Sequence, residues 1–150
     1  MTQTVLVVAA ALVNEAGQVL LAQRPQGKAM AGLWEFPGGK LEPGETPEAA
    51  LARELHEELK ISVDANELEP ITFASHAYNN FHLLMPLYLL RHWAGSPKPA
   101  EGQSLKWVAP QDLHRFPAPA ADIPLFEVLA DKLKGKNNEG SLAQVHRPGI

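Results

Sequence analysis

Three glutamates between residues 54 and 58 are the residues of this chain best suited to chemistry. Glu54, Glu57 and Glu58 stand at positions i, i+3 and i+4, so in a helix their carboxylates share one face. Like charges at this spacing destabilise an isolated helix by roughly 0.2–0.5 kcal/mol per pair. A divalent cation would offset the repulsion, and oxygen-only ligands favour Mg²⁺, Mn²⁺ or Ca²⁺. The spacing therefore predicts a hard-metal site on a helix.

The helix that must carry these glutamates is predicted to begin just after residue 46. Thr46 is a suitable N-cap, and Pro47 suits the first helical position. Apolar residues then recur at helical spacing, at Leu51, Leu55 and Leu59. The glutamates lie mostly off this stripe, which predicts a helix with one face in the core and a carboxylate face opposite.

The remaining pattern predicts strands in runs, with one helix in mid-chain and another near the end. Such an order is typical of the α+β class, here a mixed sheet with helices on its faces. Residues 1–134 would form one domain, and residues 135–150 lack periodicity and are expected to be a flexible tail. We expect strands at 4–13, 19–24, 33–36, 71–78, 81–93 and 105–108, and the second helix at 125–133.

Composition limits the classes of function. The chain has 150 residues, a net charge of −4 and no cysteine. An acidic balance argues against binding to a nucleic-acid backbone, including RNA 5′ ends. Without cysteine there is no disulfide or thiolate chemistry, which is compatible with a reducing cytoplasm. No apolar run approaches the length of a membrane span. We expect a cytoplasmic protein, a monomer or small homo-oligomer, with no membrane partner.

The spacing around the glutamates resembles the signature box of the Nudix hydrolases. All but one of the specified positions of that box are matched. The exception is Lys60, where the family usually has glycine. Either Lys60 adopts a left-handed conformation at the end of the helix, which would cost roughly 1 kcal/mol of stability, or the helix continues past it. The matching positions are Gly39, Glu45, Arg53, Glu54, Leu55, Glu57, Glu58 and Ile61.

The stretches 20–24, 32–40 and 101–103 are similar to the MutT branch of that family, over about residues 4–134. The resemblance implies a Nudix fold, with a mixed sheet sandwiched between helices. It also implies Mg²⁺-dependent hydrolysis of nucleoside triphosphates to monophosphate and pyrophosphate, with Mn²⁺ as a substitute metal. The expected substrate is 8-oxo-dGTP, in sanitation of the nucleotide pool for DNA replication and repair. CTP or another nucleotide, or a non-catalytic nucleotide-binding domain, are the alternatives.

The same resemblance assigns roles to the acidic residues. Arg53 is expected to pair with Glu45 and so orient the helix. Glu54 is the first choice for the general base, although the residues alone leave that assignment open. Mg²⁺ would be held by five groups, namely Glu54, Glu57, Glu58, Glu101 and the carbonyl of Gly38.

Substrate contacts follow from the same comparison. Arg24 and Lys40 are expected to contact phosphates. Phe36 and Tyr78 would lie near the base, and Asp122 occupies the base-reading position. Its carboxylate could accept hydrogen bonds from N1–H and N2–H₂ of guanine. The residues also allow Asp122 to be the N-cap of the last helix.

Overall fold

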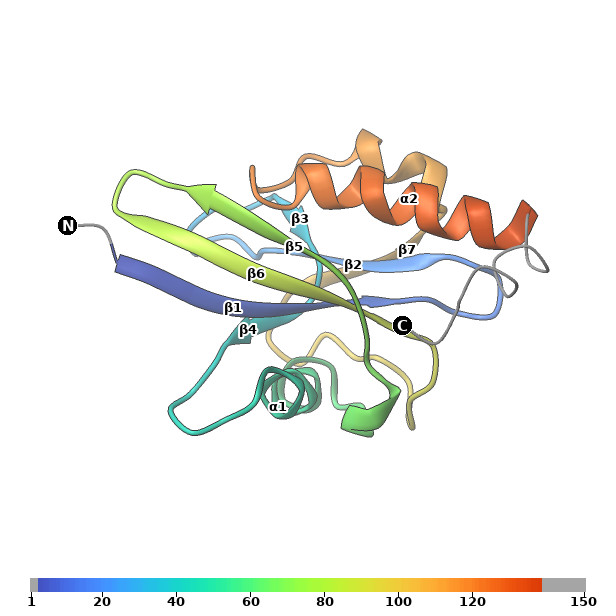
Figure 1. Cartoon of the computed structure of the whole chain (residues 1–150), viewed down its shortest axis with the longest axis horizontal. Coiled ribbons are helices and arrows are strands. Elements are labelled where there is room, and N and C mark those ends of the chain that lie inside the picture. Colours follow the sequence, from blue (N-terminus) through green and yellow to red (C-terminus); the bar gives the residue numbers. More distant parts are fainter. Residues whose placement is uncertain (1–2, 139–150) are drawn as a thin grey trace, which may run out of the picture.

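Two β-sheets lie between two long helices in the computed structural model, which describes residues 3–138 (Figure 1). In the larger sheet β1 and β6 are parallel and the other neighbours antiparallel; the smaller sheet is antiparallel. The fold is therefore α+β with a mixed sheet, as predicted. The larger sheet has the order β4 (Gly38–Lys40), β1 (Gln3–Leu12), β6 (Phe81–Leu90), β5 (Glu69–Ala77). The smaller has the order β3 (Trp34–Glu35), β2 (Val19–Gln23), β7 (Ser104–Val108).

The helices cover opposite faces of this arrangement (Figure 1). The long ones are α1 (Pro47–Leu59) and α2 (Ile123–Asn138), and the short 3₁₀ helices are η1 (Ala65–Glu67) and η2 (Pro110–Arg115). Within residues 3–138, no helix is both long and apolar enough to cross a membrane. Residues 135–138, expected to belong to the tail, continue α2, and the rest of that tail lies outside the described residues.

Strand β1 contributes to both halves of the core. Because side chains alternate along a strand, Val8 and Ala10 pack with α1, whereas Ala9 and Ala11 pack in the cluster that contains α2. The α1 cluster contains the predicted stripe of Leu51, Leu55 and Leu59, and the α2 cluster contains Leu125, Leu129 and Leu133. The small side chains of β1 let both helices approach a strand that is buried on both faces.

Strand β4 was not expected, because Pro37-Gly38-Gly39 suggests the end of a strand. The structure pairs Gly38 with Ala9 and Lys40 with Val7 of β1. A Cβ at Gly38 would overlap the backbone carbonyl of Val8. Glycine therefore allows the close approach that forms β4, although it is depleted in strands generally.

Helix α1 begins and ends at defined caps. The Thr46 hydroxyl accepts a hydrogen bond from the Ala49 N–H at 3.1 Å, and Pro47 is the first helical residue. At the other end Lys60 is left-handed, with φ 60° and ψ 32°, and its N–H donates to the His56 carbonyl at 3.0 Å. The helix thus keeps a left-handed end, with lysine in place of the glycine of the Nudix box.

This conformation of Lys60 predicts a gain in stability from glycine. Lys60→Gly should raise the free energy of unfolding by about 0.5–1 kcal/mol. An L-residue costs roughly 1–2 kcal/mol in this region, and the freer unfolded glycine chain cancels part of the relief. Urea unfolding measures the change. Lys60→Ala removes the charge but keeps the Cβ, so it should bring no such gain; equal stability of the two variants would contradict the left-handed end.

Candidate functional site

Arg53 is the centre of the hydrogen-bond network on the carboxylate face of α1. Its Nε and Nη2 donate to the two carboxylate oxygens of Glu45, at 2.6 and 2.9 Å. Nη2 also donates to the Lys40 carbonyl at 3.1 Å, and Nη1 donates to Glu54 at 3.2 Å and Glu57 at 3.4 Å. The predicted Arg53–Glu45 pair is present, and the same guanidinium ties the loop before α1 and strand β4 to the helix.

The Glu45 carboxylate accepts hydrogen bonds from both Arg53 and the backbone of Glu42. Its carboxylate accepts from the Glu42 N–H at 2.8 Å as well as from Arg53, and its own N–H donates to the Glu42 carbonyl at 3.1 Å. The hydrogen bond from Arg53, followed by that from Glu42, lowers the pKa of Glu45 to about 2. The same pairing raises the pKa of Arg53 above its ordinary value. Both groups are therefore charged at neutral pH, and the bidentate geometry fixes their orientation.

Glu54 packs against the backbone of β4. A Cβ at Gly39 would overlap the Glu54 carboxylate, so this rotamer requires glycine at that position. Only 17% of the Glu54 side chain is exposed. Strand β4 thus supplies the surface on which the first of the three glutamates rests, and the neighbouring Gly38 lines a cavity together with Glu58 and Glu101.

Glu58 is the most strongly perturbed acid of this face. Burial raises its pKa to about 9, reinforced by a hydrogen bond to Glu54 and by the negative charges of Glu54, Glu101 and Glu35. These surroundings therefore disfavour the ionised form of this carboxyl. A divalent cation placed among the same oxygens would favour the ionised form, so the donor set fits a hard metal ion.

The loop that carries Glu101 is anchored to the end of α1. The Ala100 N–H and the Gln103 side-chain amide both donate to the Glu58 carbonyl, at 3.2 and 3.0 Å. These bonds satisfy one of the carbonyls that a helix leaves free at its C-terminus. They also hold Glu101 beside the cavity that Glu58 lines.

Glu57 does not converge with the other two glutamates. Its side chain is 52% exposed and its carboxylate is turned toward Arg53. Among residues 3–138, no set of three acidic or histidine side chains is arranged to hold a cation as it stands. A site built from all three glutamates therefore requires a rotation of Glu57 away from Arg53, which its exposure permits.

Two cavities adjoin each other, because Arg24 and Glu35 line both; Glu58 of α1 lines one of them. The smaller cavity, of about 200 Å³, has the predicted metal ligands Gly38, Glu58 and Glu101 in its wall. The larger cavity, of about 440 Å³, is lined by the predicted substrate residues Lys40, Tyr78 and Asp122. Seven of the expected site residues line one or both of these cavities: Arg24, Gly38, Lys40, Glu58, Tyr78, Glu101 and Asp122. The other five line neither cavity: Phe36, Glu45, Arg53, Glu54 and Glu57.

Asp122 is a buried acid in the wall of the larger cavity, with 5% of its surface exposed. Its carboxylate accepts from the Phe36 N–H at 3.3 Å, and its carbonyl accepts from the Phe126 N–H in the first turn of α2. Burial, followed by the charge of Glu35, raises its pKa to about 7, while Phe36 and Arg24 oppose the rise. Asp122 thus precedes α2 at its N-terminus and also faces the cavity.

The two predicted aromatic residues are placed differently. Tyr78 lines the larger cavity, stacks on Phe81 with ring centroids 5.1 Å apart, and accepts a hydrogen bond from the Ala121 N–H at 3.1 Å. Phe36 is 4% exposed, and its ring packs edge-on against that of Phe126 in the core. Phe36 lines neither cavity with its ring, and its backbone is the part that reaches Asp122.

Glu35 was not among the predicted site residues. Its carboxylate lies 3.0 Å from Arg24 Nε, and burial raises its pKa although Arg24 opposes this. The sequence held one signal, an acid between Trp34 and Phe36 in an apolar strand. Its position between two cavities depends on long-range packing.

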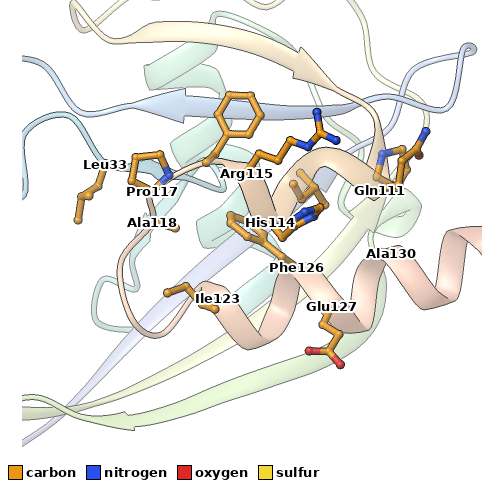
Figure 2. A pocket seen from close by; sticks show the side chains of 13 residues that line it. Leu33, Gln111, His114, Arg115, Pro117, Ala118, Ile123, Phe126, Glu127 and Ala130 are labelled. Atoms are coloured by element: carbon orange, nitrogen blue, oxygen red, sulfur yellow. The ribbon is translucent and has the colours of Figure 1, made fainter.

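A cavity larger than either of these lies elsewhere, between η2, residues 116–118 and α2 (Figure 2). It has a volume of about 800 Å³, and its wall includes Leu33, Phe116, Ile123 and Phe126. None of the predicted site residues lines it. Size alone therefore does not single out the cavities that the predicted site residues line.

Comparison with known proteins adds independent findings. A family model described as NUDIX domain matches residues 8–128. The CTP pyrophosphohydrolase of Escherichia coli K12 is 40% identical over 124 residues, 81% of this chain and 89% of that protein. An 8-oxo-dGTP diphosphatase of Haemophilus influenzae is 38% identical over 134 residues, 88% of this chain and 96% of that protein. The solution structure of the E. coli ORF135 protein has a TM-score of 0.77 at 33% identity, covering 93% of this chain and 96% of that one.

Alanine at the two glycines of β4 is predicted to destabilise the fold to different extents. Gly38→Ala should destabilise the fold by about 1–3 kcal/mol or more, because the new Cβ meets the backbone of β1. Gly39→Ala should cost much less, because its Cβ meets the flexible end of Glu54. Urea unfolding of both variants checks this. Similar losses at the two positions would contradict the close packing of β4 on β1.

Proposed function

The chain belongs to the Nudix family, and we propose that it hydrolyses nucleoside triphosphates to nucleoside monophosphates and pyrophosphate in a Mg²⁺-dependent reaction. As a Nudix hydrolase it acts on nucleotides. The observation that supports the finer proposal is the meeting of two cavities, one walled by Glu58 and Glu101 and the other by Asp122. The first suits a metal-bound phosphate chain and the second suits a base, so one nucleotide can span both.

The proposed metal ligands are all oxygen donors, which suits Mg²⁺ and also Mn²⁺. They are the carboxylates of Glu54, Glu57, Glu58 and Glu101 and the carbonyl of Gly38. When bound, the ion neutralises phosphate oxygens and lowers the pKa of a water molecule.

The chain's own residues have the following proposed roles. Arg53 keeps the Glu54 carboxylate oriented through its hydrogen bond at 3.2 Å. Water attacks the β-phosphorus, the bond from that phosphorus to the oxygen bridging the α-phosphate breaks, and Glu54 accepts the proton of the water. Arg24 lines both cavities and Lys40 lines the larger one, and these two cations attract the triphosphate toward the site.

The base is proposed to be read by Asp122. An ionised carboxylate accepts from N1–H and N2–H₂ of a guanine edge, which suits 8-oxo-dGTP. A protonated carboxyl can accept from the N4 amino group of cytosine and donate to N3, which suits CTP. The second substrate is favoured by the relative that is named CTP pyrophosphohydrolase and is 40% identical. With 8-oxo-dGTP as substrate, the chain would sanitise the nucleotide pool for DNA replication and repair in the cytoplasm.

A substrate panel tests this function. With Mg²⁺, kcat/KM is compared for 8-oxo-dGTP, dGTP, CTP, 5-methyl-dCTP and ADP-ribose, and the products are identified. We expect pyrophosphate from 8-oxo-dGTP or CTP. Glu57→Gln should lower kcat/KM by at least roughly tenfold to a hundredfold, the loss that follows even when a hydrogen-bond partner of a metal ligand is changed. Glu127→Gln on α2 should leave kcat/KM unchanged. Hydrolysis of none of the five by the unaltered chain would refute the proposal.

The pKa of Asp122 predicts a pH-dependent preference. As the pH falls through about 7, the carboxyl becomes protonated, so the ratio of kcat/KM for CTP to that for 8-oxo-dGTP should rise by roughly tenfold per pH unit. Glu35 and Arg24, the charged neighbours, act in opposite directions on this pKa. Ionisations common to both substrates cancel in the ratio.

Asp122→Asn is the matched control, because an amide both donates and accepts but does not titrate. In that variant the ratio should not depend on pH. A ratio that changes with pH equally in the variant and the unaltered chain would show that another group sets the preference.

A further inference from the structure

Met30 is an exposed apolar residue in the wall of the larger cavity, and the proposed chemistry does not use it. It lies in residues 24–33, which connect β2 to β3, and it is 42% exposed. The chain has three methionines and no cysteine, so thioethers are its only oxidisable sulfur groups. Small solutes can therefore reach a reactive side chain beside the space proposed for the base.

Hydrogen bonds hold the backbone around Met30. The residue has a φ of 60°, a left-handed conformation that is strained when a Cβ is present. Its carbonyl accepts from the Leu33 N–H at 3.2 Å. The Arg24 N–H donates to the Leu33 carbonyl and the Gly32 N–H donates to the Arg24 carbonyl, both at 3.0 Å. Because the backbone is fixed in this way, a chemical change in the Met30 side chain acts at the cavity wall.

Met85 provides an internal comparison. It lies on β6 and lines the same cavity, but it is 5% exposed and packs in the α2 cluster. The remaining methionine, Met1, lies outside the described residues. Since susceptibility to oxidation follows exposure, Met30 should react before Met85.

We propose that Met30 is a modification site, oxidised to the sulfoxide by hydroperoxides, and that this change weakens binding of the base. The effect on binding rests on the function proposed above, because the larger cavity is the one assigned to the base. The oxidation itself depends only on the exposed thioether.

The oxidation transfers one oxygen atom. The sulfur attacks the terminal oxygen of the hydroperoxide, so that an S–O bond forms and the O–O bond breaks. The sulfur loses two electrons and the peroxide is reduced; the departing oxygen takes the hydroxyl proton and leaves as water or an alcohol. A sulfoxide is polar where the thioether was apolar, so it disrupts a wall that also contains Leu83 and Phe81. Methionine sulfoxide reductases reverse the reaction.

The experiment treats the unaltered chain, Met30→Leu and Met85→Leu with hydrogen peroxide and locates sulfoxides by peptide mass spectrometry. Once Met30 is converted, we expect KM for 8-oxo-dGTP and CTP to rise roughly threefold to tenfold, the loss of part of an apolar contact, while kcat changes by less than about twofold. Met30→Leu keeps an apolar side chain of similar volume and should show no rise. Met85→Leu should respond as the unaltered chain does, and a methionine sulfoxide reductase should restore KM.

A further variant and a second readout do not depend on peroxide or on turnover. Met30→Gln places a polar group at the cavity and should raise KM without treatment. Calorimetric titration with dGMP and CMP should show affinity falling by the same factor on oxidation of the unaltered chain, with no change in Met30→Leu.

The outcomes separate this proposal from the proposed function. If the unaltered chain hydrolyses no triphosphate but oxidation of Met30 weakens binding of the monophosphates, the proposed function fails and the modification site stands. If Met30 is fully converted while KM and affinity keep their values, the modification site is refuted. The same conclusion follows if treated Met30→Leu loses affinity equally, or if Met85 is oxidised before Met30.

Discussion

The bidentate pair between Arg53 and Glu45 is the interaction on which the rest of the site depends. Three carboxylates within one and a half turns of α1 repel one another, and Arg53 places a positive charge among them. Because Glu45 holds the guanidinium from the preceding loop, the remaining N–H groups point at β4 and at Glu54. The loop, the strand and the helix are thereby fixed relative to one another.

The fold supports this arrangement through close backbone packing. Strand β4 can pair with β1 because Gly38 has no Cβ to meet the β1 backbone. Gly39 in turn leaves room for the Glu54 carboxylate. On the other side, the loop before β7 bonds to the last turn of α1 and brings Glu101 to the cavity of Glu58. Rigid contacts thus surround a group of acids that would be unfavourable without a cation.

Much of α1 could be predicted because its signals are local. The cap at Thr46 and the stripe of leucines lie within one short segment, whereas the Arg53–Glu45 pair was expected from the resemblance to the Nudix box. Strand β4 could not be predicted, since its glycines have no preference for strands and it exists only through pairing with β1. For the same reason, the sequence could not predict that Glu35 lines both cavities, or that Asp122 both precedes α2 and lines the larger cavity. Their surroundings are set by residues distant in sequence.

The central claim is that the carboxylate face of α1 binds a divalent cation in an arrangement oriented by Arg53. Electron paramagnetic resonance of Mn²⁺ titrated into the unaltered chain, Glu57→Gln, Arg53→Lys and the surface control Arg115→Lys tests it most directly. The account predicts binding in the unaltered chain and the control, and roughly tenfold to hundredfold weaker binding in the other two. Absence of binding, or equal affinity in all four proteins, would contradict it.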